Sequence, residues 1–381
     1  MKEEKFLFSN CILLNEKLFF IEYYSGLPTF MDPESGDISY CGVIHNYLYK
    51  TGDIVDSIDC HQQKVYILEQ SGENLIILDL EKKECCYKKL DCDYYPWGNY
   101  AAFEKYQSDY YIFPRYGDKI FAVNTNIDEI IERTADLCGI GEPRFCCRAG
   151  NKVWILAEGK KVIGAFDLTC QTTEIYELNK EIESLADAVN IEENIYFLNQ
   201  IGIIYKWNIN EKRIEIFQTL KIKQDKKISV SRMIHAGNSL IVFPAMDEDI
   251  NIVDLASKEI KVYQGYPSDF EYQAAGWGWT YGWSQYFGYC EDEDYYYFAM
   301  RSANYVLKVN KENGEFIWIK PNIPSREEMQ RLKVKTKYAM GNTLFYEDEM
   351  TIIDLAKMDL KNGKNQKSKS VGSKIYKEIA K

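Results

Sequence analysis

The sequence lacks the spaced residues from which metal and nucleophile sites are usually built. Its three histidines, His45, His61 and His235, are scattered, and no Cys-x-x-Cys occurs among its 11 cysteines. A zinc site needs thiolates and imidazoles clustered at short spacing. A Gly-x-Ser-x-Gly elbow is missing as well. The sequence therefore predicts no metal site and no cofactor, and it offers no catalytic motif.

Long apolar runs are also missing. No stretch approaches the ~18 apolar residues of a membrane span. The N-terminus, residues 1–8, carries charges of both signs and is then only briefly apolar, unlike a secretory signal peptide. These absences predict a cytoplasmic protein without a membrane span. In that compartment thiols stay reduced, so most of the cysteines are expected to act as small buried hydrophobic residues.

Positive charge is scarce over most of the chain. The formal net charge is −12, from 46 Lys and Arg against 58 Asp and Glu. Binding to nucleic acid needs a basic footprint, so an acidic body argues against that partner. Residues 357–381 are the exception, with eight Lys against Asp359 and Glu378, a balance of +6. This tail is interpreted as a solvated segment, with contact to an anionic surface as the alternative.

What the sequence does contain is a repeat. Residues 64–79 and 152–167 share an apolar run, a polar turn, a second apolar run and a closing Asp. The closing residue recurs along the chain as Asp32, Asp79, Asn124, Asp167, Asn208, Asp254 and Asn310. The successive steps are 47, 45, 43, 41, 46 and 56 residues. Asp and Asn suit a turn because their side chains bond the backbone two residues on.

The period and the strand pattern together predict the fold. Each unit contains four short strands separated by turns, and a period of about 40–50 residues is typical of propeller blades. The aromatic content of 14% also favours strands. Helices are excluded because polar or Gly breaks interrupt the runs every five to eight residues. The prediction is an all-β, seven-bladed β-propeller of four-stranded antiparallel blades, expected to be a monomer.

The C-terminal boundary has two interpretations. An eighth unit begins at Tyr338, but its Asp354 follows the second strand too soon. The favoured division is a propeller over residues 8–345 and an appendage over residues 346–381, a short helix followed by a lysine-rich tail. The alternative is eight blades with a truncated last blade.

The repeat resembles the β-propeller repeat superfamily, which contains the kelch and WD-repeat domains, over residues 8–345. The Gly-Gly of kelch and the Trp-Asp and Gly-His of WD repeats are missing at the blade positions. No family's functional residues therefore transfer to this chain. The resemblance implies ligand binding at the mouth of a central channel, on loops that join blades or strands.

One enlarged connection, residues 265–286, is a candidate binding site. Its aromatic residues are interleaved with glycine, a composition that offers flat faces for stacking. The four that stand closest together are Trp277, Trp279, Tyr281 and Trp283. The alternative is that these rings pack against a neighbouring blade.

Arginines near strand ends form a second candidate site. If they converge at the channel mouth they make an anion site, because the guanidinium fork matches carboxylate and phosphate. The residues concerned are Arg115, Arg144, Arg232 and Arg301. Surface ion pairs with acids are the alternative interpretation.

Two classes of function follow. The first is a non-enzymatic binding or scaffold protein that holds a protein, peptide or glycan partner on a propeller face and the aromatic connection. The second is a carbohydrate-active enzyme that uses paired carboxylates near that connection, with Asp269, Glu271 and residues 291–294 as candidates.

Overall fold

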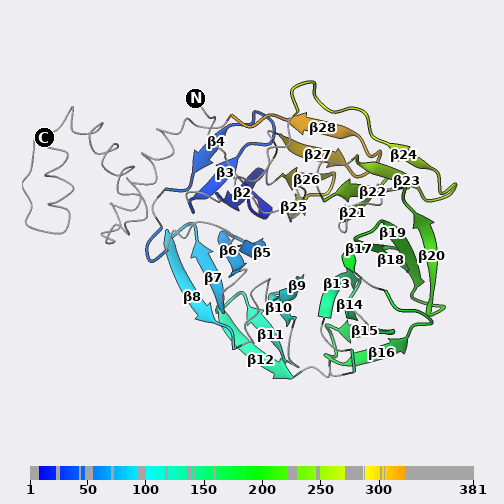
Figure 1. Ribbon diagram of the computed structural model, residues 1–381. Helices are drawn as coiled ribbons and strands as arrows, with labels where there is room; N and C mark the ends of the chain where they lie inside the picture. Colours follow the sequence, from blue (N-terminus) through cyan, green and yellow to red (C-terminus); the bar gives the residue numbers. More distant parts are fainter. Residues whose placement is uncertain are drawn as a thin grey trace, which may run out of the picture.

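The computed structural model places its described residues in seven sheets arranged around a common axis (Figure 1). Each sheet is a blade of four antiparallel strands whose order in space is their order in the chain. The description covers residues 8–22, 26–42, 44–47, 55–69, 73–91, 100–115, 119–134, 137, 139–140, 143–157, 160–182, 184–221, 230–245, 249–270, 286, 288–300, 303 and 305–322.

The strands fall into four concentric sets. The innermost strands are β1 (Cys11–Leu14), β5 (Val55–His61), β9 (Tyr100–Tyr106), β13 (Pro143–Ala149), β17 (Leu185–Ile191), β21 (Val230–Ala236) and β25 (Gly288–Glu291). The second strands are β2 (Lys17–Ile21), β6 (Lys64–Glu69), β10 (Asp109–Pro114), β14 (Lys152–Ala157), β18 (Asn194–Asn199), β22 (Ser239–Pro244) and β26 (Tyr295–Ala299). The third strands are β3 (Pro28–Met31), β7 (Asn74–Asp79), β11 (Lys119–Asn124), β15 (Val162–Asp167), β19 (Ile203–Asn208), β23 (Asn251–Asp254) and β27 (Val306–Asn310). The outermost strands are β4 (Ile38–Tyr40), β8 (Glu84–Lys89), β12 (Glu129–Thr134), β16 (Thr173–Glu177), β20 (Arg213–Thr219), β24 (Ile260–Val262) and β28 (Phe316–Ile319).

The recurring Asp or Asn occupies the same place in all seven blades. It closes the third strand, and its side-chain oxygen accepts hydrogen bonds from backbone N–H groups two or three residues further on. Asp167 Oδ1, for example, accepts from Thr169 N at 2.8 Å and Cys170 N at 3.1 Å. The other six blades have at least one such bond, accepted by Asp32, Asp79, Asn124, Asn208, Asp254 and Asn310. The predicted turn chemistry is thus confirmed.

The residue four positions after the closing Asp or Asn has a left-handed backbone, with φ between 55° and 78°. In blade order these residues are Gly36, Lys83, Asp128, Gln171, Lys212, Lys258 and Gly314. In every blade this residue contacts the preceding blade. Asp128, for instance, pairs with Lys64 at 2.5 Å and accepts a hydrogen bond from the Tyr66 hydroxyl at 2.8 Å. Lys212 lies over the ring of Tyr176 at 4.6 Å. We call this repeated contact the turn clasp.

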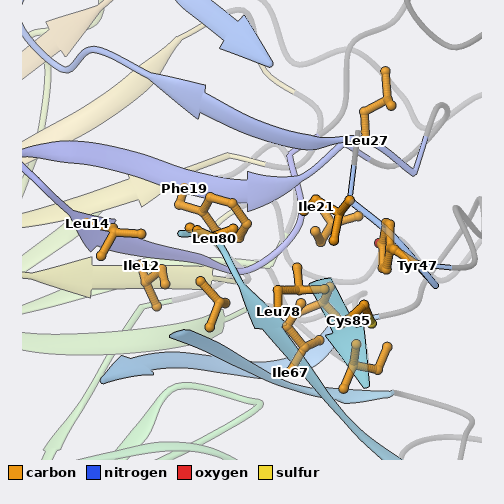
Figure 2. Close-up of a cluster of buried hydrophobic side chains, with 14 residues drawn as sticks. Ile12, Leu14, Phe19, Ile21, Leu27, Tyr47, Ile67, Leu78, Leu80 and Cys85 are labelled. Atoms are coloured by element: carbon orange, nitrogen blue, oxygen red, sulfur yellow. The ribbon is translucent and has the colours of Figure 1, made fainter. Parts of the chain in front are cut away.

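The hydrophobic core is divided among the blade interfaces. Seven clusters of buried residues are found, one between each pair of neighbouring blades. Figure 2 shows the cluster between the first two blades, which includes Phe19 of β2, Ile67 of β6 and Leu78 of β7. All three side chains are fully buried. A single blade is too thin to bury both faces, so each depends on its neighbours.

Among the described residues, no strand is exchanged between the first and last blades. The blade of β25–β28 lies directly beside the blade of β1–β4 (Figure 1). The described residues form seven blades, as the favoured prediction required. The eighth unit beginning at Tyr338 and the appendage over residues 346–381 lie outside the described residues. Within the described part, no helix is long and apolar enough to cross a membrane.

Candidate functional site

The innermost strands surround the axis and share an irregularity near one end. In five blades the second residue of the inner strand is the extra residue of a β-bulge. The residues at this position are Asp56, Ala101, Arg144, Ala186 and Ser231. A bulge re-aims the side chains around it and is frequent next to functional sites. Five bulges at one level therefore mark this end of the channel.

Three blades place charged residues at this level. Asp56 lies on β5 of the second blade, and Arg232 lies on β21 of the sixth, on the far side of the axis (Figure 1). Arg115 directly follows β10 of the third blade. The charges of Arg115 and Arg232 both oppose the rise that burial causes in the pKa of Asp56, so both guanidinium groups act on this carboxyl group.

Arg115 is held by a residue of its own blade, and Arg232 is held by a residue of the preceding blade. The Nε of Arg115 donates to the carbonyl oxygen of Tyr100 at 3.0 Å. The Nη1 of Arg232 lies 3.4 Å from Oδ1 of Asp187, and the other oxygen of Asp187 accepts from Met233 N at 2.8 Å. These bonds limit the rotamers of both guanidinium groups. We call Asp56, Arg115, Asp187 and Arg232 the channel cluster.

Burial dominates the electrostatics of the acids in the channel. It raises the pKa of Asp56 to about 7, against the opposing charges of Arg115 and Arg232. It also raises the pKa of Glu104 to about 7, with Arg148 opposing and Asp59 adding to the rise. Both side chains nevertheless keep partial solvent exposure. They are thus surrounded by protein but reached by channel water.

Charges rather than hydrogen bonds act on the carboxyl groups of Asp56 and Glu104. Among the described residues, no hydrogen bond is donated to either side chain, and the arginines near them oppose the effect of burial. The Asn10 amide donates to the backbone oxygen of Asp56, which positions the bulge from the first blade. Acids whose pKa is shifted by burial together with a specific charged group are candidates for functional sites.

Tyr289 of β25 adds a phenol to the same end of the channel. Burial raises the pKa of its hydroxyl, and the charges of Asp187 and Arg232 also act on it. Its side chain still has 37% of its surface exposed, an unusual value for an aromatic residue of an innermost strand. Its ring lies 5.3 Å from that of Phe298, which fixes its direction.

The predicted convergence of the arginine set at the channel mouth stays a prediction. The charges of Arg115 and Arg232 both act on the carboxyl group of Asp56. Arg144 occupies the bulge position of β13, level with Asp56, and nothing is described of its side chain. Arg301 lies outside the described residues. Arg148, at the other end of β13, lies 5.6 Å from the centre of the Tyr106 ring.

The ends of the aromatic connection pack against neighbouring strands. Tyr286 is fully buried, with its ring 4.8 Å from Phe243 and 6.1 Å from Phe298. At the other end, Phe270 lies 5.0 Å from Trp318 of β28. Both described ends of the connection are therefore packed against neighbouring strands. Trp277, Trp279, Tyr281 and Trp283 lie outside the described residues.

The candidate acids of that connection are engaged elsewhere. Asp269 pairs with Lys320 and accepts a hydrogen bond from the Tyr305 hydroxyl at 2.6 Å, and these bonds lower its pKa. Glu291 pairs with Lys311 at 2.8 Å. Glu271 lies outside the described residues. Sequence reasoning missed Asp56 and Glu104 instead, and a lone acid in a strand carries no motif that would have identified them.

The described residues hold no group of three or more His, Cys, Asp or Glu arranged to bind a metal ion. No family model matches the sequence, and no curated protein matches it. Solved structures do share its fold. A streptogramin B lyase aligns with a TM-score of 0.55 and 13% identity over 84% of this chain and 95% of its own.

Two further structures give the same result. PorZ, a surface component of the type-IX secretion system of Porphyromonas gingivalis, aligns with a TM-score of 0.53 and 13% identity over 85% of this chain and 39% of its own. The designed protein Ika8 aligns with a TM-score of 0.51 and 9% identity over 83% of this chain and 87% of its own. At such identities the likeness establishes the β-propeller fold alone, shared by an enzyme, a secretion component and a design.

Proposed function

We propose that this chain is a non-enzymatic binding protein that holds a protein, peptide or glycan at one mouth of its channel. An anionic group of that ligand lies between Arg115 and Arg232. The observation that carries the proposal is that Arg115 and Arg232, from different blades, are each held at the level of the bulges, Arg115 by the carbonyl oxygen of Tyr100 and Arg232 by Asp187. Guanidinium forks match carboxylates and phosphates in geometry and charge.

Protonation of Asp56 supports an anionic ligand. A carboxyl group with a pKa of about 7 is half neutral at neutral pH. A ligand carboxylate close to it favours the neutral form further, because like charges oppose each other. The affinity for an anion is therefore expected to fall as the pH rises through 7. This direction distinguishes binding in the channel from binding to an ordinary surface lysine.

A panel of matched probes tests the proposal. Glucuronate, citrate, inorganic phosphate and a tripeptide with a free carboxylate are compared with glucose and the tripeptide amide by thermal shift and calorimetry. At least one anionic probe is expected to bind, and Arg115→Gln is expected to weaken it roughly tenfold or more. Arg213→Gln, on the exposed strand β20, is the matched control. Binding that persists in Arg115→Gln, or failure of every anionic probe, contradicts the proposal.

The aromatic connection is assigned a share in the same ligand. Replacement of Trp277, Trp279 and Trp283 by Ala is expected to abolish binding of the panel's best probe while the melting temperature stays nearly unchanged. A collapse of the melting temperature would instead identify these rings as core.

A second candidate function is hydrolysis of a glycan. The observation that favours it is that Asp56 of β5 and Glu104 of β9 lie on the innermost strands of neighbouring blades, and that burial raises the pKa of each to about 7, which suits general acid and base catalysis. Release of reducing sugar from an oligosaccharide panel is the measurement. Activity that is lost in Glu104→Gln supports hydrolysis, and absence of activity in the wild type leaves binding as the function.

A further inference from the structure

The contact between the first and last blades differs from every other blade contact. Neighbouring blades elsewhere follow one another in the chain, whereas the blade of β1–β4 and the blade of β25–β28 meet only in space (Figure 1). Their described contacts are non-covalent, and they share no strand. We call this contact the seam.

Polar contacts secure the outer part of the seam. Asn322, just after β28, donates its backbone N–H to the oxygen of Gly36 at 2.8 Å and its amide to Oδ1 of Asp37 at 2.7 Å. Lys308 of β27 reaches Glu34 at 2.9 Å. Much of this set is exposed, so each contact contributes little by itself.

Two thiols face each other at the inner part of the seam. The sulfur atoms of Cys11 on β1 and Cys290 on β25 are 3.6 Å apart, although 279 residues separate them in the chain. Both are free cysteines. Cys11 is buried among the residues of the seam cluster, and Cys290 is partly exposed beside Tyr289. A small oxidant in the channel therefore meets Cys290 first.

We propose that Cys11 and Cys290 are an oxidation site at which a disulfide closes the propeller covalently. A disulfide needs sulfur atoms about 2 Å apart, so the pair requires a small adjustment and no change of blade order. The neighbouring Cys60 is aimed differently, because its sulfur lies 3.8 Å from the carbonyl oxygen of Leu13. The inference does not depend on the proposed function.

A diazene oxidant such as diamide accepts the two electrons and two protons that the pair of thiols loses. The Cys290 thiolate adds to one nitrogen of the N=N bond, forming an S–N bond, and the other nitrogen takes a proton. The Cys11 thiolate then attacks the Cys290 sulfur, the S–S bond forms, and the S–N bond breaks. The leaving nitrogen takes the second proton. Two thiols are oxidised to one disulfide, and the diazene is reduced to a hydrazine.

The pKa of the Cys290 thiol controls how fast the pair is oxidised. Burial and the neighbouring sulfur of Cys11 raise the pKa of the Cys290 thiol well above its usual value. The thiolate is the nucleophile, so at neutral pH the pair resists weak oxidants. Oxidation is therefore expected to accelerate between pH 7 and pH 9.

Diamide treatment of the full chain tests the site. Intact mass is expected to fall by two hydrogen atoms, and non-reducing peptide mapping is expected to join the peptides of Cys11 and Cys290. Because the bond closes most of the chain into one loop, the melting temperature is expected to rise by roughly 5 °C. Reduction by dithiothreitol is expected to reverse both effects.

Two variants control the experiment. Cys290→Ser is expected to lose the cross-link and the rise in melting temperature, whereas Cys170→Ser, at an exposed turn cysteine, is expected to keep both. Joining of Cys290 to Cys60, a melting temperature that falls on oxidation, or absence of the Cys11–Cys290 peptide at pH 9 would overturn the proposal.

Discussion

The turn clasps are alike in all seven blades, whereas the side chains of the innermost strands differ from blade to blade. All seven clasps have a closing Asp or Asn, at least one backbone N–H that donates to its side chain, and a left-handed residue four positions after it. The innermost strands share a backbone, including five bulges at one level, but their side chains differ from blade to blade. What recurs in every blade builds the ring. What occurs once, such as Asp56 opposite Arg232, distinguishes this propeller from others.

The largest loss of stability is expected at Gly36, where the turn clasp of the first blade contacts the last blade across the seam. Gly36 has φ of 78°, and a Cβ atom there would overlap the carbonyl oxygen of Lys320. Gly36→Ala is expected to lower the free energy of unfolding by roughly 3 kcal/mol, from backbone strain and the clash. Gly314→Ala is the matched control, because its Cβ would lie 3.8 Å from the nearest atom, Ile241 Cδ1. If urea unfolding showed that Gly36→Ala and Gly314→Ala lose the same free energy of unfolding, the close contact of Gly36 with Lys320 would not explain the loss.

The next largest loss of stability is expected for a substitution in the channel cluster. Asp187→Ala removes one ion-pair partner of Arg232 and the acceptor of Met233 N. Both groups are then left in a largely buried setting, so a loss of about 2–3 kcal/mol is expected in urea unfolding. Glu291→Ala, which breaks a more exposed pair with Lys311, is expected to change stability by less than about 0.5 kcal/mol. A small loss for Asp187→Ala would mean that the cluster is loosely organised.

A smaller effect is expected within a single clasp. Asp167→Ala leaves Thr169 N and Cys170 N without their acceptor, at a cost of about 1 kcal/mol. Asp167→Asn is expected to be nearly neutral, because Asn accepts the same bonds in the clasps of Asn124 and Asn208. If Asp167→Asn were as destabilising as Asp167→Ala, charge rather than hydrogen bonding would form the turn.

The two regions are also expected to respond oppositely to pH. Backbone N–H groups lower the pKa of the clasp carboxylates Asp32 and Asp167, so their stabilisation is present above pH 4 and lost as the pH falls below it. Asp56 and Glu104 hold protons up to a pKa of about 7 in the folded state, so stability falls as the pH rises from about 4 to 7. Asp56→Asn with Glu104→Gln is expected to remove most of the fall. An unchanged profile of melting temperature against pH would contradict these assignments.

The sequence predicted the repeated features and missed the unrepeated ones. The spacing of Asp79 and Asp167 implied blades because a turn that recurs at one register reports a shared fold. Convergence of Arg115 and Arg232 at the channel mouth is a hypothesis drawn from their places at strand ends, and it stays a prediction, although the charges of both act on the carboxyl group of Asp56. Asp56 could not be identified, because its orientation arises from a bulge and its environment from distant blades.

The central claim is that Arg115 and Arg232 share one electrostatic site with Asp56. An NMR pH titration of the Asp56 carboxyl carbon, assigned with Asp56→Asn, measures this without any ligand. The account predicts a pKa near 7 that rises further in Arg115→Gln and in Arg232→Gln and stays constant in Arg213→Gln. A pKa near 4, or one that neither channel variant changes, would contradict it.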